Sequence, residues 1–264
     1  MLISTHTPLV IKVGGSLLED ANAAKSLFAV IKQLLPTRPV LLVHGGGNKV
    51  NTILSELGYS SGKIDGLRIT PKQHLPYVVG ALAGTVNKTL CAWAITEEVT
   101  PVGLSLLDGN MCTAKQVSAD LGHVGEVTKG SNDLLLAINK LKHLPIISSI
   151  AANPKDGLLN VNADDAAAVI AELVEGQLIL LSDVPCVLDA NKQPIETLTP
   201  DDIARLIAED VIQEGMAVKV NAAMHAATQI GLPVIIASWK TPEKLLGLLA
   251  GEAIGTSVYG ELAE

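Results

Sequence analysis

A lysine interrupts an otherwise apolar segment just before a glycine turn near the start of the chain. Residues 9–13 (LVIKV) predict a buried parallel strand, and Lys12 lies within it, two residues before Gly14-Gly15. Burying an ammonium group without an anionic partner is costly, so Lys12 is a candidate for binding an anion. A lysine on an edge strand, or one whose ammonium reaches solvent, would show the same local pattern.

A second glycine turn, Gly45-Gly46-Gly47, follows the next predicted strand, residues 39–44, and precedes a predicted helix. Glycines let backbone N–H groups approach a phosphate closely, and the N-terminus of a following helix favours negative charge. Neither turn has the spacing G-x-x-x-x-G-K-[ST] or G-x-G-x-x-G. A single turn of this kind is equally well explained by the lack of space for side chains in a tight turn and by phosphate binding. Two turns at the carboxyl ends of neighbouring parallel strands favour a phosphate site.

Strands and helices alternate along the chain, which predicts βαβ units and a mainly parallel central sheet. Thr70-Pro71 predicts the start of a long helix that reaches about residue 96, with Pro76 kinking its first turns. Residues 112–127 combine turn residues with short apolar alternation, which predicts hairpins. The other predicted strands are 99–104, 145–150, 178–181, 234–237 and an edge strand at 256–259. Two further predicted helices end near residues 35 and 57, and the others span 132–142, 162–174, 201–209 and 216–230.

Composition narrows the class of protein. A chain of 264 residues, 48% of them apolar, suits one α/β domain or two closely fused lobes. A net charge of -8 argues against nucleic acid and anionic membranes as partners, and 2% aromatic residues are too few for base stacking.

Cysteine spacing and hydropathy point to a cellular compartment. Cys91, Cys112 and Cys186 are far apart, which favours a reducing compartment and argues against a structural zinc site. We assign no side chain to a metal. No signal peptide pattern opens the chain. Charges or glycines interrupt each apolar run before the ~20 residues of a membrane span, so we expect a cytoplasmic protein.

Six short motifs occur in an order that resembles the amino acid kinase family. The resemblance runs from about residue 8 to the C-terminus and is greatest to members that act on N-acetyl-L-glutamate. Cys186 stands where the family usually has glycine, and Gln213-Glu214 where it often has Thr-Asp. The motifs are IKVGGS (11–16), VHGGG (43–47), GLRIT (66–70), NVNAD (160–164), LSDV (181–184) and GMAVKVNAA (215–223).

The resemblance implies a fold and an activity. The expected fold is α/β, a three-layer αβα sandwich with a mainly parallel central sheet, formed by one domain over residues 1–264. Residues 1–175 would form an N-terminal lobe with the acyl-amino-acid site and the dimer face, and 176–264 a C-terminal lobe with the ATP site. The expected activity is ATP-dependent phosphorylation of the side-chain carboxylate of N-acetyl-L-glutamate, the second step of arginine biosynthesis, with ATP and Mg²⁺.

The resemblance also assigns roles to matching residues. Lys12 and Lys219 would stabilise the transferring phosphoryl group, and Asp164 would lie between them and keep both charged and oriented. The acceptor carboxylate is already ionised near neutral pH, because its ordinary pKa is ~4.3, so no general base is needed. The implied substrate-binding residues are Gly45, Gly46, Arg68 and Asn162, and the implied nucleotide- or phosphate-binding residues are Gly14, Gly15, Ser182, Asp183 and Met216.

The resemblance further implies a homodimer. Relatives that arginine inhibits carry an extra N-terminal helix that links dimers into hexamers. Only residues 1–8 precede the first predicted strand here, too few for such a helix, so we expect no arginine inhibition by that route. The long helix after Thr70 is a candidate dimer face or simply a buried core helix.

Three other functions compete with this interpretation. A different acceptor, such as glutamate, aspartate, carbamate or a nucleoside monophosphate, would use the same fold. A catalytically silent sensor of arginine or nucleotide would not need Lys12, Asp164 and Lys219 together. A dinucleotide-dependent oxidoreductase is disfavoured because G-x-G-x-x-G is missing.

Overall fold

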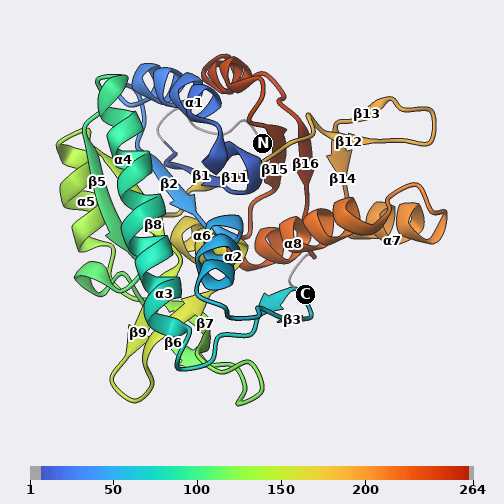
Figure 1. The fold of residues 1–264 in the computed structure, drawn as a ribbon. Helices are drawn as coiled ribbons and strands as arrows, with labels where there is room; N and C mark the ends of the chain where they lie inside the picture. Colours follow the sequence, from blue (N-terminus) through green and yellow to red (C-terminus); the bar gives the residue numbers. More distant parts are fainter. Residues whose placement is uncertain (1–6, 262–264) are drawn as a thin grey trace.

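A computed structural model of the chain describes residues 7–261, built around one large sheet (Figure 1). The strand order is β14-β16-β15-β11-β1-β2-β8-β5, and each pair of neighbours is parallel except β15 and β16. This confirms the mainly parallel sheet. The strands are β1 (Leu9–Val13), β2 (Val40–His44), β5 (Pro101–Ser105), β8 (Leu144–Ser148), β11 (Gln177–Ser182), β14 (Thr197–Leu198), β15 (Val234–Ser238) and β16 (Thr256–Val258).

Successive residues of each central strand pack into two different apolar clusters, one on each face of the sheet. Val10 belongs to the cluster that contains α6 (Ala163–Leu173) and the buried side of α8 (Glu214–Ile230). Ile11 belongs to the cluster that contains α1 (Ala21–Leu34), part of α4 (Asn87–Thr96) and part of the 3₁₀ segment Pro242–Ala250. Strands buried on both faces explain the unbroken apolar runs, and the three-layer αβα arrangement is confirmed.

The described residues also form further α-helices. They are α2 (Gly47–Glu56), α3 (Leu75–Val79), α5 (Asp133–Lys140) and α7 (Pro200–Ala208). Helix α7 begins with a capping box between Thr199 and Asp202, so its start follows from local sequence.

The predicted start of the long helix at Thr70 is wrong. Thr70 is buried and pairs with Gly122 in an isolated bridge, and its N–H donates to the carbonyl of Leu121 at 2.9 Å. The helix begins at Leu75, so Pro76 lies in its first turn, where proline costs no hydrogen bond. The irregularity comes later, as a π-helical turn at Gly80–Val86 between α3 and α4.

A second, four-stranded sheet has the order β6-β7-β10-β9 and leads into α6. Strands β6 and β7 pair antiparallel, as predicted for residues 112–127, whereas the predicted strand 145–150 divides between β8 and β9. The predicted edge strand at 256–259 is also wrong in position, because β14 pairs beyond β16. The strands of this sheet are β6 (Cys112–Gln116), β7 (Val124–Lys129), β9 (Ile150–Asn153) and β10 (Gly157–Val161). Two small hairpins are separate from both sheets: β3 (Lys63–Ile64) pairs with β4 (Leu67–Arg68), and β12 (Val187–Leu188) pairs with β13 (Pro194–Ile195).

Two expectations about the chain as a whole stay predictions. The proposed lobe boundary immediately precedes β11, and the large sheet continues across it through the β1–β11 pair. The expectation that no helix precedes β1 falls mostly on residues 1–6, outside the described part of the chain.

Within residues 7–261, one helical stretch is long and apolar enough, by length and composition alone, to cross a membrane. It spans Leu75–Thr96, with a mean hydropathy of 1.3 and 44% of its most apolar window buried. The same composition serves a core helix, and this stretch packs against α1, α2 and β5.

Candidate active site

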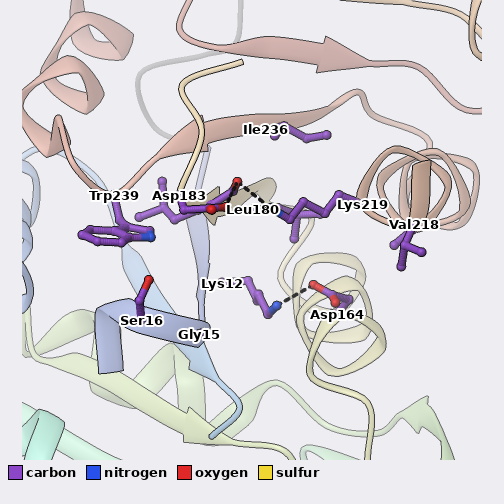
Figure 2. A pocket seen from close by; sticks show the side chains of 14 residues that line it. Lys12, Gly15, Ser16, Asp164, Leu180, Asp183, Val218, Lys219, Ile236 and Trp239 are labelled. Carbon is purple, nitrogen blue, oxygen red and sulfur yellow. Dashed lines mark hydrogen bonds and ion pairs between the residues drawn. The ribbon is translucent and has the colours of Figure 1, made fainter. Parts of the chain in front are cut away.

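Two lysines lie where the order of the central strands changes direction. The chain passes from β1 to β2 on one side, whereas β11 is followed by β15 on the other. Such a switch point leaves a crevice at the carboxyl ends of the strands, where ligands of open α/β sheets bind. A cavity of about 370 Å³ occupies this place and is lined by both Lys12 and Lys219 (Figure 2).

Lys12 forms an ion pair with Asp164, with its Nζ 2.8 Å from Oδ1. Lys12 lies on the same sheet face as Val10, the face that α6 covers, and Asp164 is in the first turn of α6. Asn162 caps that helix by accepting hydrogen bonds from the N–H groups of Asp164 (2.7 Å) and Asp165 (3.4 Å). The lysine side chain is only 19% exposed, so the carboxylate supplies the partner that burial requires.

Lys219 projects from α8 towards the end of β11 (Figure 2). Its Nζ lies 2.8 Å from Oδ1 of Asp183 and 3.1 Å from Oγ of Ser182. The hydrogen bond from Lys219 is the main reason why the pKa of Asp183 is below its usual value. In the described residues each lysine therefore has its own carboxylate, whereas the sequence interpretation placed Asp164 between both.

The Gly45-Gly46-Gly47 turn is closely packed from two sides. A Cβ on Gly46, whose φ is +155°, would lie 2.9 Å from Cδ2 of Leu82 and 3.0 Å from Cγ2 of Val86. A Cβ on Gly45 would lie 3.1 Å from the Cβ of Ala163, at the start of α6. The second glycine turn therefore requires glycine for conformation and for space.

A second cavity, of about 240 Å³, lies on the other side of the Lys12–Asp164 pair. It shares Lys12, Gly14, Gly15 and Asp164 with the first cavity. Its other walls include the second glycine turn, the β3–β4 hairpin and the end of β10. The two cavities therefore meet at one ion pair and one glycine turn.

Arg68 reaches this second cavity from the β3–β4 hairpin. Its Nη2 donates to the carbonyl of Gly47 at 3.0 Å, and its Nη1 donates to Oγ of Ser61. Desolvation lowers the pKa of the half-buried Arg68 guanidinium. Arginine side chains nevertheless keep their positive charge in proteins. The hairpin turn is Asp65-Gly66, with positive φ at both residues, and Asp-Gly is a sequence pattern that typically predicts a hairpin.

The structure brings together all but one of the predicted site residues. Gly14, Gly15, Ser182 and Asp183 line the first cavity, and Gly45, Gly46, Arg68 and Asn162 line the second. Met216 instead packs, partly buried, against the larger apolar cluster and lies outside both linings as described. Its assignment to the nucleotide site stays a prediction.

Some lining residues were not identified from the sequence. Asn160 is nearly buried in the second cavity, and its Nδ2 donates to Oγ1 of Thr70 at 3.2 Å. Asn160 lies in the NVNAD motif, the same motif that predicts Asn162 as a substrate-binding residue, so the motif could have identified both asparagines. Ser149 lines the second cavity and Trp239 the first, next to Ser16 in Figure 2. Neither has a local pattern that distinguishes it from a core residue.

Comparisons with known proteins concern the family and the fold. The sequence profile of the amino acid kinase family matches residues 7–238. A protein of Aeromonas salmonicida (strain A449) named acetylglutamate kinase is 46% identical over 252 residues, which cover 95% of this chain and 97% of that one. The crystal structure of smu.665 from Streptococcus mutans UA159 has a TM-score of 0.74 at 26% identity, covering 96% and 98% of the two chains. N-acetylglutamate synthase from Neisseria gonorrhoeae, solved with coenzyme A and N-acetyl-glutamate, has a TM-score of 0.81 at 22% identity and shares the fold over 97% of this chain and 60% of that one.

Proposed function

Because the chain belongs to the amino acid kinase family, we propose that it transfers the γ-phosphoryl group of ATP to the side-chain carboxylate of N-acetyl-L-glutamate. The product is N-acetyl-L-glutamyl 5-phosphate, and the reaction is the second step of arginine biosynthesis. One observation carries the proposal: two cavities meet at the Lys12–Asp164 pair and the first glycine turn. A donor in one cavity and an acceptor in the other would react across that point.

Lys12 and the glycine-turn amides would stabilise the transferring group. Phosphoryl transfer passes through an in-line transition state with negative charge on the moving group, so the protein contributes positioning and electrostatic stabilisation. The ammonium of Lys12, oriented by Asp164, and the N–H groups of Gly14, Gly15 and Gly46 would face that charge. The N–H of Gly45 instead donates to the carbonyl of Val13 (3.5 Å), so Gly45 would contribute to the site by shaping the turn. The acceptor carboxylate is already ionised, so no residue has to remove a proton.

Lys219 would act on the nucleotide side of the first cavity. Its contacts with Asp183 and Ser182 hold the ammonium at the end of β11, where the phosphates of ATP would enter. We assign the first cavity to ATP because it lies between β11, β15 and α8, away from Arg68.

Mg²⁺ would be held mainly through the phosphates of ATP and water. In residues 7–261 no group of three or more His, Cys, Asp or Glu side chains is placed to bind a metal. The two carboxylates nearest the junction each contact a lysine at 2.8 Å. This donor set fits a cation that arrives with its nucleotide, where it would neutralise charge on the β- and γ-phosphates.

Trapping the product tests the substrate and the chemistry together. The purified protein is incubated with ATP, Mg²⁺, hydroxylamine and one of N-acetyl-L-glutamate, L-glutamate, L-aspartate or UMP. We expect ATP consumption and a hydroxamate with N-acetyl-L-glutamate alone, and no turnover when EDTA removes the metal. Turnover with another acceptor would discard the substrate assignment, and no turnover with any acceptor would favour the sensor.

We also propose a cytoplasmic homodimer without nucleic-acid or membrane partners. The supporting observations are the net charge of -8 and the side chains of Tyr77 and Ile95, which are exposed on the apolar helical stretch Leu75–Thr96. Burying such a face against a second copy would remove apolar surface from water. Light scattering after size exclusion should give twice the mass of the chain, and a monomer or a hexamer would contradict this proposal.

A further inference from the structure

The side chain of His44 is completely buried at the end of β2, immediately before the second glycine turn. Its Nδ1 lies 2.8 Å from the carbonyl oxygen of Gly45, and its Nε2 lies 3.0 Å from Nδ2 of Asn87. Asn87 is also buried and is the first residue of α4, directly after the π-helical turn. The mechanism above gives neither side chain a role, although His44 contacts the turn that faces the transferring group.

The hydrogen bonds around these two side chains allow only one arrangement of protons. Nδ2 of Asn87 lies 2.8 Å from the carbonyl oxygen of Ile146 and 3.3 Å from that of Leu104, and a carbonyl can only accept. The Asn87 amide nitrogen can only donate, so Nε2 of His44, which faces it, must accept. The two hydrogens of this amide are shared among three acceptors, of which the Leu104 carbonyl is the most distant. The single proton of the neutral ring must then be on Nδ1, where it donates to the Gly45 carbonyl.

The ring is neutral near physiological pH. Desolvation lowers the pKa of His44 to about 4, although the hydrogen bond to Gly45 opposes this shift. A neutral ring can accept at Nε2 and donate at Nδ1 simultaneously, which the imidazolium cannot do. Burial thus keeps the ring in the only protonation state that satisfies both neighbours.

The bond to the Gly45 carbonyl sets the direction of the next N–H group. In a planar trans peptide the carbonyl of Gly45 and the N–H of Gly46 point in opposite directions. A carbonyl held towards His44 therefore aims the Gly46 N–H away from the buried ring, and Gly46 lines the second cavity. Among the described hydrogen bonds, none is donated by this N–H to a protein group.

We propose that His44 and Asn87 are positioning residues that hold the Gly45–Gly46 peptide with the Gly46 N–H aimed at the transferring phosphoryl group. This inference rests on the proposed function and deepens it. Leu82 and Val86 of the π-helical turn pack against Gly46 and complete the support. Losing one preorganised donor to developing charge costs ~10²–10³ in kcat, whereas ground-state binding depends on it less.

Two substitutions of His44 isolate the hydrogen bond to Gly45. His44→Leu and His44→Asn introduce side chains of similar size and shape, and only Asn keeps an N–H near the position of Nδ1. We expect His44→Leu to lower kcat about 100-fold and His44→Asn to be about tenfold faster than His44→Leu, with both KM values within about threefold of the wild type. Equal kcat in the two variants, or a His44→Leu kcat within about threefold of wild type, would overturn the proposal.

Gln177→Leu is the matched control. Gln177 is also buried, and its amide donates to the carbonyls of Leu178 (3.1 Å) and Pro233 (2.6 Å) at the opposite end of the same sheet. Its loss should lower the thermal unfolding temperature but leave kcat and both KM values unchanged. A loss of kcat equal to that of His44→Leu would mean that any buried amide or imidazole has this effect, which also counts against the proposal.

The tautomer of His44 can be measured in the wild-type protein, so the proposal stays testable if a variant fails to fold. Long-range ¹H–¹⁵N correlation spectra should show a neutral ring protonated at Nδ1 from about pH 6 to pH 8. A ring protonated at Nε2, or an imidazolium in that range, would overturn the proposal. This spectrum needs no turnover, whereas the wild-type rate in the hydroxamate assay tests the proposed function alone.

Discussion

Lys12→Ala should lower kcat by about 10³-fold while changing the KM for N-acetyl-L-glutamate by less than about threefold. The ammonium lies at the junction of the two cavities, where the phosphoryl group would pass, and it would bind that group most strongly in the transition state. The substrate carboxylate would still find Arg68, so ground-state binding should change little. Steady-state kinetics with both substrates varied would measure the effect.

Lys115→Ala is the control for Lys12→Ala. Lys115 is also ion-paired, with its Nζ 3.0 Å from Oε2 of Glu126, but it is 74% exposed on β6 and away from both cavities. Its loss should leave kcat unchanged, because an exposed pair contributes little. A wild-type kcat for Lys12→Ala would remove this residue from the mechanism, provided that thermal unfolding shows a folded variant.

Arg68→Ala should raise the KM for N-acetyl-L-glutamate roughly 100-fold and leave the KM for ATP within about twofold of wild type. The guanidinium lines the second cavity and would bind the α-carboxylate of the acceptor through two parallel hydrogen bonds. Losing a charged hydrogen-bonded pair of this kind costs ~1.5–3 kcal/mol. Arg68→Lys should recover little of the affinity, because an ammonium cannot reproduce the planar fork.

Arg205→Ala is the matched control for Arg68→Ala. Arg205 is an exposed arginine of α7 that pairs with Asp202 (3.0 Å) and Glu209 (3.5 Å), so its loss should change neither KM. A higher KM for ATP alone in Arg68→Ala would show that the assignment of the two cavities is wrong. A change in both KM values would indicate a general distortion of the site.

Some elements could be predicted because their signals are local. β1 and β2 are mostly apolar runs followed by glycines, and the structure confirms both strands and their parallel pairing. The start of the long helix could not be predicted in this way. Thr70-Pro71 has the local pattern of a helix start, but Thr70 pairs with Gly122, 52 positions away, and a distant partner outweighs a weak local preference.

The sequence could not predict which lysine of the site forms an ion pair with which carboxylate. Lys12, Asp164, Asp183 and Lys219 were all identified as site residues, but they come from four separate elements. Which carboxylate contacts which lysine depends on how α6 and α8 lie on the sheet. The role proposed for His44 depends likewise on Asn87, because a histidine in an apolar strand has no distinctive pattern until its two hydrogen-bond partners are known.

The class of fold, the two glycine turns and the lysine before the first of them could all be predicted from the sequence, because these features depend on residue type and on neighbours within a few positions. Only the folded structure shows that two cavities meet at Lys12 and Asp164, that Lys219 pairs with Asp183, and that a buried imidazole contacts the second turn. The difference lies in the distance along the chain over which each kind of interaction acts. Strand and turn preferences act along the chain, whereas ion pairs, desolvation and close packing act through space, between residues that only the folded chain brings together.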